Sequence, residues 1–146
     1  MILEVFIPGQ IRSKQRPRFL RDKGFAYTPS QTRNYENHIK AVFTDKYPQH
    51  VPIDAKEPIE LTMVANFSVP KSTSEKKKKL MLAGFIKPTK KPDADNILKQ
   101  IDALNKIAFH DDSQITTVTI TKKYSQIEGL YIKINTITNN QTEIIL

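Results

Sequence analysis

The sequence predicts an α/β domain in which helices flank a mixed β-sheet, an α+β-type arrangement forming one compact domain over residues 1–146. The length predicts a core that needs no disulfide or metal staple, because a chain of this size buries about 68% of its unfolded surface. Segments with strand alternation and segments with helical spacing follow one another along the chain, which predicts elements packed around one sheet. The absence of cysteine excludes disulfides, zinc–thiolate sites and thiol nucleophiles.

Four segments have the alternation or the β-branched and aromatic content of strands. They are residues 2–7, 58–68, 115–124 and 130–137. The last two are expected to be joined by a turn at Gln126–Gly129.

A basic segment, IRSKQRPRFLRDKGFAYTP, follows the first strand and spans residues 11–29. Asp22–Gly24 has the composition of a turn, so the segment is predicted to form a loop and a hairpin. We expect its aromatic residues, Phe19, Phe25 and Tyr27, to pack in the core rather than to intercalate between bases.

Two helices are predicted on either side of the second strand. Thr28-Pro29-Ser30 is typical of a helix start, and apolar residues at helical spacing continue to about Tyr47-Pro48. Residues 72–84, STSEKKKKLMLAG, predict a short helix that a Ser or Thr caps and Gly84 closes.

A third helix of about twelve residues is expected over ILKQIDALNKIA, with Asp95 or Asn96 as its N-cap. Ile97, Ile101, Leu104 and Ala108 share one face at helical spacing. Lys99, Asp102 and Lys106 are expected on the opposite face.

The formal net charge is +8 and the sequence pI is about 9.6. A basic balance of this size favours polyanion partners, nucleic acid first, over a protein that is basic merely for solubility. The N-terminal sequence lacks the basic start and apolar run of a signal peptide, and no stretch has the roughly 20 apolar residues that span a bilayer. We therefore expect a cytoplasmic protein without a membrane partner.

Two acidic stretches interrupt this basic chain: KPDADN at residues 91–96 and FHDDSQI at residues 109–115. In an extended segment, Asp93 and Asp95 point the same way and converge on one point. Asp112 lies beyond a helix roughly 18 Å long, so it reaches that point only if the chain returns. Carboxylates gathered in this way suit Mg²⁺, which takes oxygen ligands and water and stabilises charge on phosphate. The alternative is that these residues only form turns and caps.

Lys99 has two interpretations. It forms an i, i+4 pair with Asp95, a contact worth only about 0.2–0.5 kcal/mol. Alternatively, it is a cation beside a scissile phosphate, where it stabilises developing charge. The spacing alone leaves both open. His110 is interpreted as a surface histidine before a turn rather than as a general base.

The stretch KPDADNILK…DALNKIAFHDDSQI resembles the central motif of the RusA family of Holliday junction resolvases. The segments IPGQ, KQRPRF and AYTPSQTRNYE resemble phage- and prophage-borne members of that family. The resemblance spans residues 3–124. Family members have one more residue between the Lys and the Asp-Ala-Leu, and one deleted residue rotates the rest of a helix by about 100°. No family role is therefore carried over to Asp102.

The resemblance implies a Mg²⁺-dependent homodimeric endonuclease that cuts four-way DNA junctions in symmetrically related strands, with Mn²⁺ as an alternative ion. Its catalytic residues correspond to Asp93, Asp95, Lys99 and Asp112, of which the three Asp are the metal ligands. Asp111 matches the first Asp of the family's pair and is a weaker candidate ligand. Two other functions stay open: a DNA-junction binding protein without catalysis, and another metal-dependent nucleic-acid phosphodiesterase.

Two basic stretches are candidates for DNA binding. Lys14, Arg16 and Arg18 lie in the predicted loop and hairpin. Lys76 and Lys77 begin a run of four lysines in the short helix, and the alternative for this run is a solvated helix face, since four adjacent residues cannot all face one way. A homodimer is expected because paired cuts need two active sites related by a two-fold axis.

Overall fold

The computed structural model describes residues 1–27 and 29–137. Two expectations lie outside these ranges: the role of Thr28 in the helix start, and that of the tail over residues 138–146. The described elements are β1 Ile2–Pro8, β2 Arg18–Leu20, β3 Phe25–Tyr27, α1 Ser30–Lys46, β4 Ile59–Phe67, α2 Glu75–Leu82, α3 Ala94–Leu98, the 3₁₀ helices η1 Lys99–Leu104 and η2 Asp112–Gln114, β5 Ile115–Tyr124 and β6 Gly129–Thr136.

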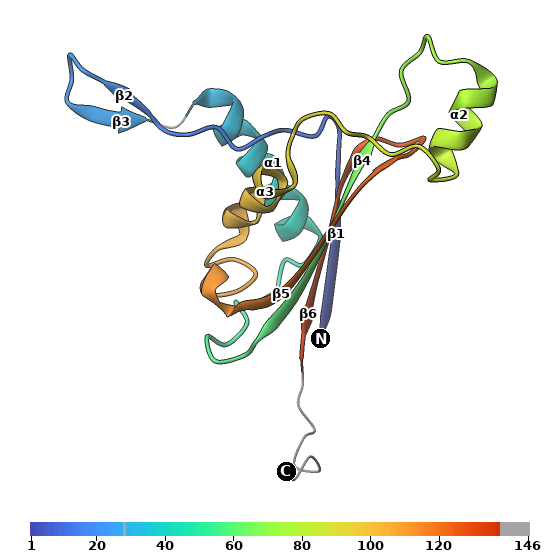
Figure 1. The fold of residues 1–146 in the computed structure, drawn as a ribbon. Helices are drawn as coiled ribbons and strands as arrows, with labels where there is room; N and C mark the ends of the chain where they lie inside the picture. The colour runs from blue at the N-terminus through green and yellow to red at the C-terminus, as the bar shows by residue number, and fades with distance from the viewer. Residues whose placement is uncertain (28, 138–146) are drawn as a thin grey trace, which may run out of the picture.

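The predicted fold class is confirmed: a four-stranded mixed sheet with helices on it forms one compact domain (Figure 1). The strand order is β1-β6-β4-β5, with β5 parallel to β4 and the other pairs antiparallel. The predicted hairpin is also confirmed, because β2 and β3 pair with each other as a separate two-stranded ribbon.

The two final strands are joined by a short connection, as expected, but they are not neighbours in the sheet. β4 lies between them, and the amide of Ser125 donates a hydrogen bond to the carbonyl of Phe67 where the connection crosses the end of β4. Burial explains this order. β6 buries Leu130, Ile132 and Ile134 and therefore suits the sheet interior, whereas β5 is mostly exposed and suits an edge.

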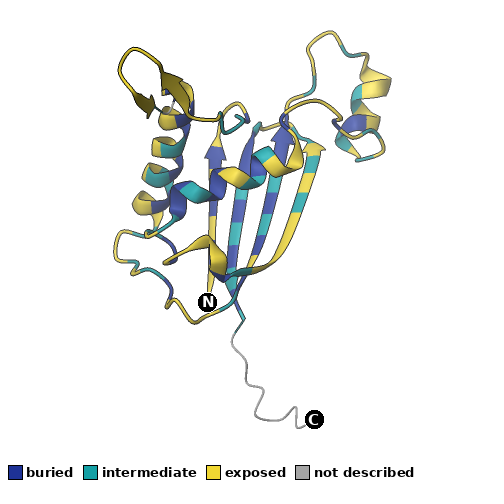
Figure 2. Cartoon of the chain, turned by 60° about the vertical axis from the view of Figure 1, so that its left-hand side comes forward, coloured by how far each residue is buried: buried dark blue, intermediate teal, exposed yellow. Residues whose placement is uncertain are grey.

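The core lies between the sheet and the helices α1 and α3–η1, which cover the same face (Figure 2). α1 contributes Tyr35, Ile39 and Phe43 to this core. The residues predicted for the buried face of the third helix are all buried: Ile97, Ile101, Leu104 and Ala108. The hairpin and α2 project from opposite sides of this body (Figure 1).

The third helix differs from the prediction. It begins at Ala94 with Asp93 as the N-cap, continues as an α-helix only to Leu98, and then tightens into η1. It ends at Leu104, because Lys106 takes a φ of 67° in the left-handed region and cannot continue a helix. Lys106 thus lies in a turn, not on a helix face.

The aromatic residues of the hairpin also differ from the prediction. Phe19 and Phe25 were expected in the core, but they are 62% and 49% exposed. Their ribbon projects beyond the reach of the main core, so no apolar surface of the body covers them (Figure 1). Among residues 1–27 and 29–137, no helix has the length and apolar content that crossing a bilayer requires.

Candidate functional site

The stretch from Asp93 to Lys99 lies at the start of the third helix. Asp93 is the N-cap but makes no side-chain capping bond, and Asp95 lies in the first turn. The stretch is not extended throughout, as had been expected: Asp93 has an extended backbone, but Asp95 already lies in the first turn of the helix. The Lys99 ammonium lies 3.9 Å from an Asp95 carboxylate oxygen, with the two side chains 50% and 70% exposed.

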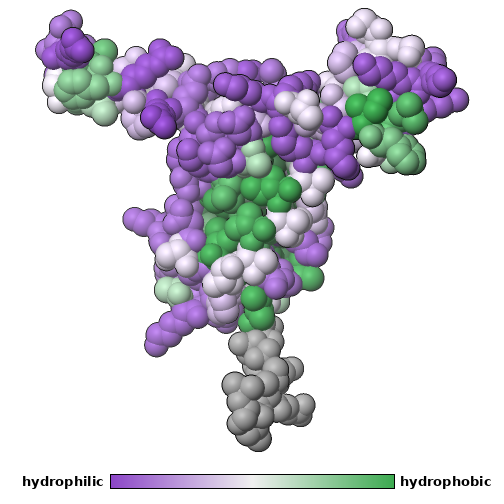
Figure 3. All heavy atoms as spheres, viewed as in Figure 1, coloured by the Kyte–Doolittle hydropathy of each residue, from purple (hydrophilic) through white to green (hydrophobic). Residues whose placement is uncertain are grey.

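Lys99 and Asp102 lie on one side of η1, as the predicted helical face required. A 3₁₀ helix turns about 120° per residue, so residues three apart are eclipsed, whereas in an α-helix they would be about 60° out of register. Lys99 and Asp102 accordingly line the same pocket of about 320 Å³, whose other lining residues besides Asp112 are apolar. The lining residues are Leu98, Lys99, Ile101, Asp102, Asp112, Ile115 and Val118. Figure 3 shows the apolar side chains gathered on this face beside α3 and η1.

Asp112 reaches this pocket through a short acidic loop that folds back after Phe109. Asp111 and Gln114 form a reciprocal capping box around η2. The buried amide of Gln114 accepts hydrogen bonds from the backbone N–H groups of His110 and Asp111, at 2.9 and 3.0 Å. It donates to the carbonyls of Asp54 and Glu57, at 2.7 and 3.1 Å. These four bonds hold the acidic loop in place.

The chain therefore returns, and Asp112 lies beside Asp102 at the pocket. Partial burial raises the pKa of the Asp112 carboxyl, and the nearby carboxyl of Asp102 and the charge of Asp111 raise it further. The adjacent Asp111 behaves in the opposite way, because hydrogen bonds from Ser113 lower the pKa of its carboxyl. Two carboxyls that face one another in this way repel when both are ionised.

Lys14 of the basic segment also reaches the pocket residues. Its ammonium lies 2.9 Å from Asp102 and 3.5 Å from Glu36. Burial by itself would lower the pKa of Lys14, but the hydrogen bond and charge of Asp102, together with Glu36, outweigh burial and raise it. Lys14 was predicted to bind DNA; within the chain it pairs with two carboxylates.

Two further contacts anchor the base of the basic segment to the body. The buried side chain of Gln100 in η1 donates to the carbonyl of Arg12 at 2.7 Å. The amide of Gln15 donates to the hydroxyl of Thr32 at 3.0 Å, and the Lys14–Asp102 pair lies between these two contacts in the sequence. The basic segment thus has a defined position relative to the acidic pocket.

The carboxylates of this site are oxygen ligands of the kind that a divalent cation takes, but they are not clustered around one point. Across the part of the chain that the structure describes, no three His, Cys, Asp or Glu side chains lie close enough together to hold a metal ion. The donors around the pocket are all carboxylate oxygens, the ligand type that Mg²⁺ prefers. The repulsion between Asp102 and Asp112 is the kind that a bound cation relieves.

The other predicted DNA-binding residues are exposed. Arg16 and Arg18 lie on the approach to the hairpin and on β2, and Lys76 and Lys77 lie on α2. His110 is exposed on the acidic loop, as expected for a surface histidine.

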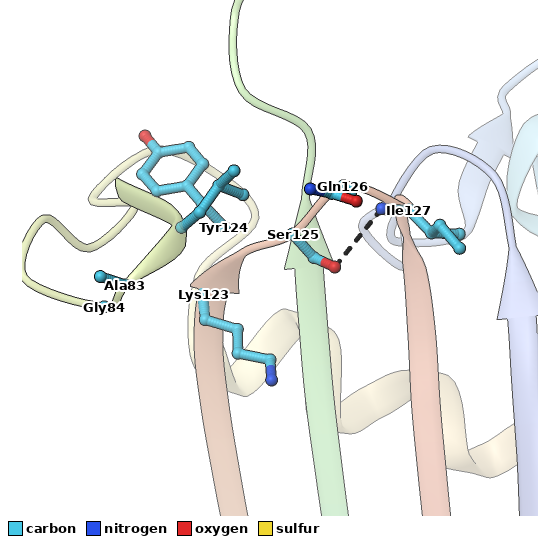
Figure 4. A pocket seen from close by; sticks show the side chains of 8 residues that line it. Ala83, Gly84, Lys123, Tyr124, Ser125, Gln126 and Ile127 are labelled. Carbon is cyan, nitrogen blue, oxygen red and sulfur yellow. Dashed lines mark hydrogen bonds between the residues drawn. The ribbon is translucent and has the colours of Figure 1, made fainter. Parts of the chain in front are cut away.

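A larger pocket, of about 550 Å³, lies between the end of α2 and the connection from β5 to β6 (Figure 4). Lys123, Tyr124 and Ser125 are among its lining residues, and the Ser125 hydroxyl accepts a hydrogen bond from the amide of Ile127 at 3.4 Å. No carboxylate and no histidine line it. This pocket is larger, but it lacks the carboxylates and imidazoles that acid–base or metal chemistry would use.

Three residues of the site have roles that the sequence prediction did not assign. Asp102 faces Asp112, Glu36 pairs with Lys14, and Gln114 holds the acidic loop. Only the role of Gln114 has a sequence signal, because Asp-x-x-Gln is a capping-box pattern. The approach of Asp102 to Asp112 and the pair of Glu36 with Lys14 have none, because both join segments that are distant in the chain.

The family model described as Endodeoxyribonuclease RusA matches residues 8–135, which extends the predicted resemblance from residue 124 to nearly the end of β6. The uncharacterized protein YqaN of Bacillus subtilis (strain 168) is 32% identical over 101 residues, covering 67% of this chain and 69% of YqaN. The match brings together the acidic stretches, Lys99 and the basic segment in one family domain. The chain belongs to the RusA family of endodeoxyribonucleases, and it is therefore an enzyme that hydrolyses DNA.

Proposed function

We propose that the chain is a Mg²⁺-dependent endodeoxyribonuclease that resolves four-way DNA junctions by paired cuts in symmetrically related strands. The observation that carries this proposal is the pocket beside α3–η1, where Lys99, Asp102 and Asp112 meet at the anchored base of a basic segment. The basic segment gathers the polyanion, and the acidic pocket supplies oxygen ligands at the place where the phosphate arrives.

Asp93, Asp95 and Asp112 would hold Mg²⁺, or Mn²⁺ as an alternative ion. Bound there, the ion lowers the pKa of water and stabilises negative charge on the phosphate. The Lys99 ammonium lies 3.9 Å from Asp95, and its side chain is 50% exposed. It is therefore accessible to a phosphate oxygen on which negative charge develops. Asp102 faces Asp112 and pairs with Lys14, so the Lys14 ammonium offsets part of the negative charge beside Asp112.

DNA contacts follow from the exposed cations. Arg16 and Arg18 would bind phosphates next to the pocket, and Lys76 and Lys77 would bind them at the far side of the body. Because one chain carries one such pocket among its described residues, paired cuts imply a homodimer with a two-fold axis. Sedimentation should then give twice the 16.8 kDa mass of one chain.

The test uses a labelled synthetic four-way junction and a matched linear duplex, each incubated with the protein in Mg²⁺, Ca²⁺ or EDTA. We expect paired nicks on the junction alone and with Mg²⁺ alone. Binding to the junction without cleavage in every metal and at several pH values would refute the proposed activity. Cutting of the duplex at the same rate would instead indicate a general phosphodiesterase.

The site assignment is tested with Asp95→Asn, which should abolish cleavage and leave junction binding intact or tighter. Asp45→Asn is the matched control, since it removes the same charge from an exposed position near the C-terminal end of α1. If Asp95→Asn cuts at the rate of the Asp45→Asn control, the ligand assignment is wrong.

A further inference from the structure

The hairpin arm, which we define as residues Arg18–Tyr27, projects from the body as a two-stranded ribbon (Figures 1 and 2). Arg18, Phe19 and Leu20 of β2 pair with Tyr27, Ala26 and Phe25 of β3. The two strands pack mainly against each other rather than against the sheet or the helices. A lone two-stranded ribbon is only marginally stable in water, so a partner that covers it would stabilise it.

Large apolar side chains stand on both faces of the arm. Neighbouring residues of a strand point to opposite faces, so Phe19 lies on one face and Leu20 with its cross-strand partner Phe25 on the other. Phe19 is 62% exposed, Phe25 49% and Leu20 36%. Exposed aromatic side chains on a projecting element mark an interaction surface. Because both faces of the ribbon carry exposed apolar side chains, a partner that covers them must contact the ribbon from both sides.

The charges of the arm select the kind of partner. Arg18, Arg21 and Lys23 are exposed, and within the arm only Asp22 opposes them. Figure 3 shows hydrophilic and hydrophobic residues side by side on the arm. The same arm of a second copy would bring the same excess of cations and so meet like charge. Nucleic acid offers phosphates for the cations and flat apolar base faces for the aromatic rings. Bases in an intact duplex are stacked on one another, so the rings find a partner only where stacking is interrupted.

We propose that the hairpin arm enters the open centre of branched DNA, where Phe19 and Phe25 stack on bases on either side and Arg18 and Arg21 bind flanking phosphates. The anchors at its base, Gln100 to Arg12 and Lys14 to Asp102, set the arm at a defined position relative to the acidic pocket. The arm therefore supplies selectivity for branched over linear DNA. This inference rests on the proposed function, since it names the feature of the substrate that the enzyme recognises.

The test compares Phe19→Ala/Phe25→Ala with Phe85→Ala, which removes an aromatic ring that is 80% exposed just beyond α2. Binding of the labelled junction and of the matched duplex is measured in EDTA, where no cleavage occurs. The double variant should lose about 5- to 150-fold in junction affinity for each stacked base. Its duplex affinity and the slope of log affinity against log salt should not change, because phenylalanine releases no counterions. The control should bind both DNAs as the unmodified chain does.

The outcomes test the role of the hairpin arm separately from the proposed junction-cutting activity. Equal junction affinity for the double variant and the control overturns the inference, even if the unmodified chain cuts junctions. A selective loss of junction affinity supports it, even if the unmodified chain cuts nothing. If light scattering shows that the double variant changes the mass of the protein without changing junction affinity, the arm binds a second copy and the DNA assignment is refuted. Circular dichroism of both variants should match the unmodified chain, because the replaced side chains are exposed.

Discussion

Replacing Gln114 by Leu should destabilise the protein because this one side chain satisfies four backbone groups. It is only 6% exposed and accepts from His110 and Asp111 while donating to Asp54 and Glu57. A net contribution of about 0.5–1.5 kcal/mol per hydrogen bond gives about 2–6 kcal/mol for four. The partner residues are exposed, so water replaces part of the loss, and we expect about 2–4 kcal/mol.

Urea unfolding followed by circular dichroism measures this loss. With a denaturant slope of about 2 kcal/mol per molar, the unfolding midpoint should fall by about 1–2 M. Gln100→Leu is the matched control, because Gln100 is 1% exposed but makes a single hydrogen bond and leaves its side-chain oxygen unpartnered. The control should cost about 1 kcal/mol or less.

Gln114→Leu should also weaken metal use, because the same bonds hold the loop that carries Asp112. The Mg²⁺ concentration for half-maximal cleavage should rise about 10- to 100-fold, the usual effect of removing a group that orients a metal ligand. If Gln114→Leu and Gln100→Leu lose equal stability, the four-bond account of the acidic loop is wrong.

Three further predictions follow from contacts elsewhere. In a double-mutant cycle of Lys14→Met and Asp102→Asn, urea unfolding should give a coupling of about 0.5–1 kcal/mol, since both side chains are partly exposed; additive losses would mean that the pair contributes nothing. Burial raises the pKa of Tyr35 to about 12 from 10.0, and its hydroxyl has no partner. Folding favours the neutral form, so the stabilisation is complete below pH 10 and on the order of 3 kcal/mol is lost as pH rises through 12. Tyr35→Phe should lack this part of the alkaline loss and be more stable at neutral pH by about 1 kcal/mol, and an unchanged pH profile in urea titrations would contradict the assignment. Gly129→Ala should lower the free energy of unfolding by about 1–3 kcal/mol, because the new Cβ would meet the Phe6 ring and lie 2.6 Å from the carbonyl oxygen of Ile7. A thermal midpoint equal to that of the unmodified chain would show that the sheet relaxes there.

The order of elements could be predicted from the sequence because it depends on local periodicity. The strands at β1, β4, β5 and β6 follow their alternation, and the buried residues of α3–η1 follow helical spacing. The turn of the hairpin follows from Asp22–Gly24, where Gly24 takes a φ of 66° that suits glycine. The family, too, was evident from short motifs, and the family model confirms it.

The pairing of strands could not be predicted in the same way. The short connection after β5 favoured a neighbouring β6, but the burial of β6 required a place inside the sheet, with β4 beside it. The exposure of Phe19 and Phe25 likewise depends on where the ribbon projects, which composition does not reveal.

The sequence by itself determined which chemical groups the protein has: clustered carboxylates, a lysine among them and a basic segment ahead of them. Only the tertiary structure decided which of these groups meet. The bonds of Gln114 return Asp112 to Asp102, and Lys14 of the basic segment reaches Asp102. The Gln114 bonds join residues 57 and 60 positions apart and the Lys14–Asp102 bond joins residues 88 positions apart, so local spacing does not predict them.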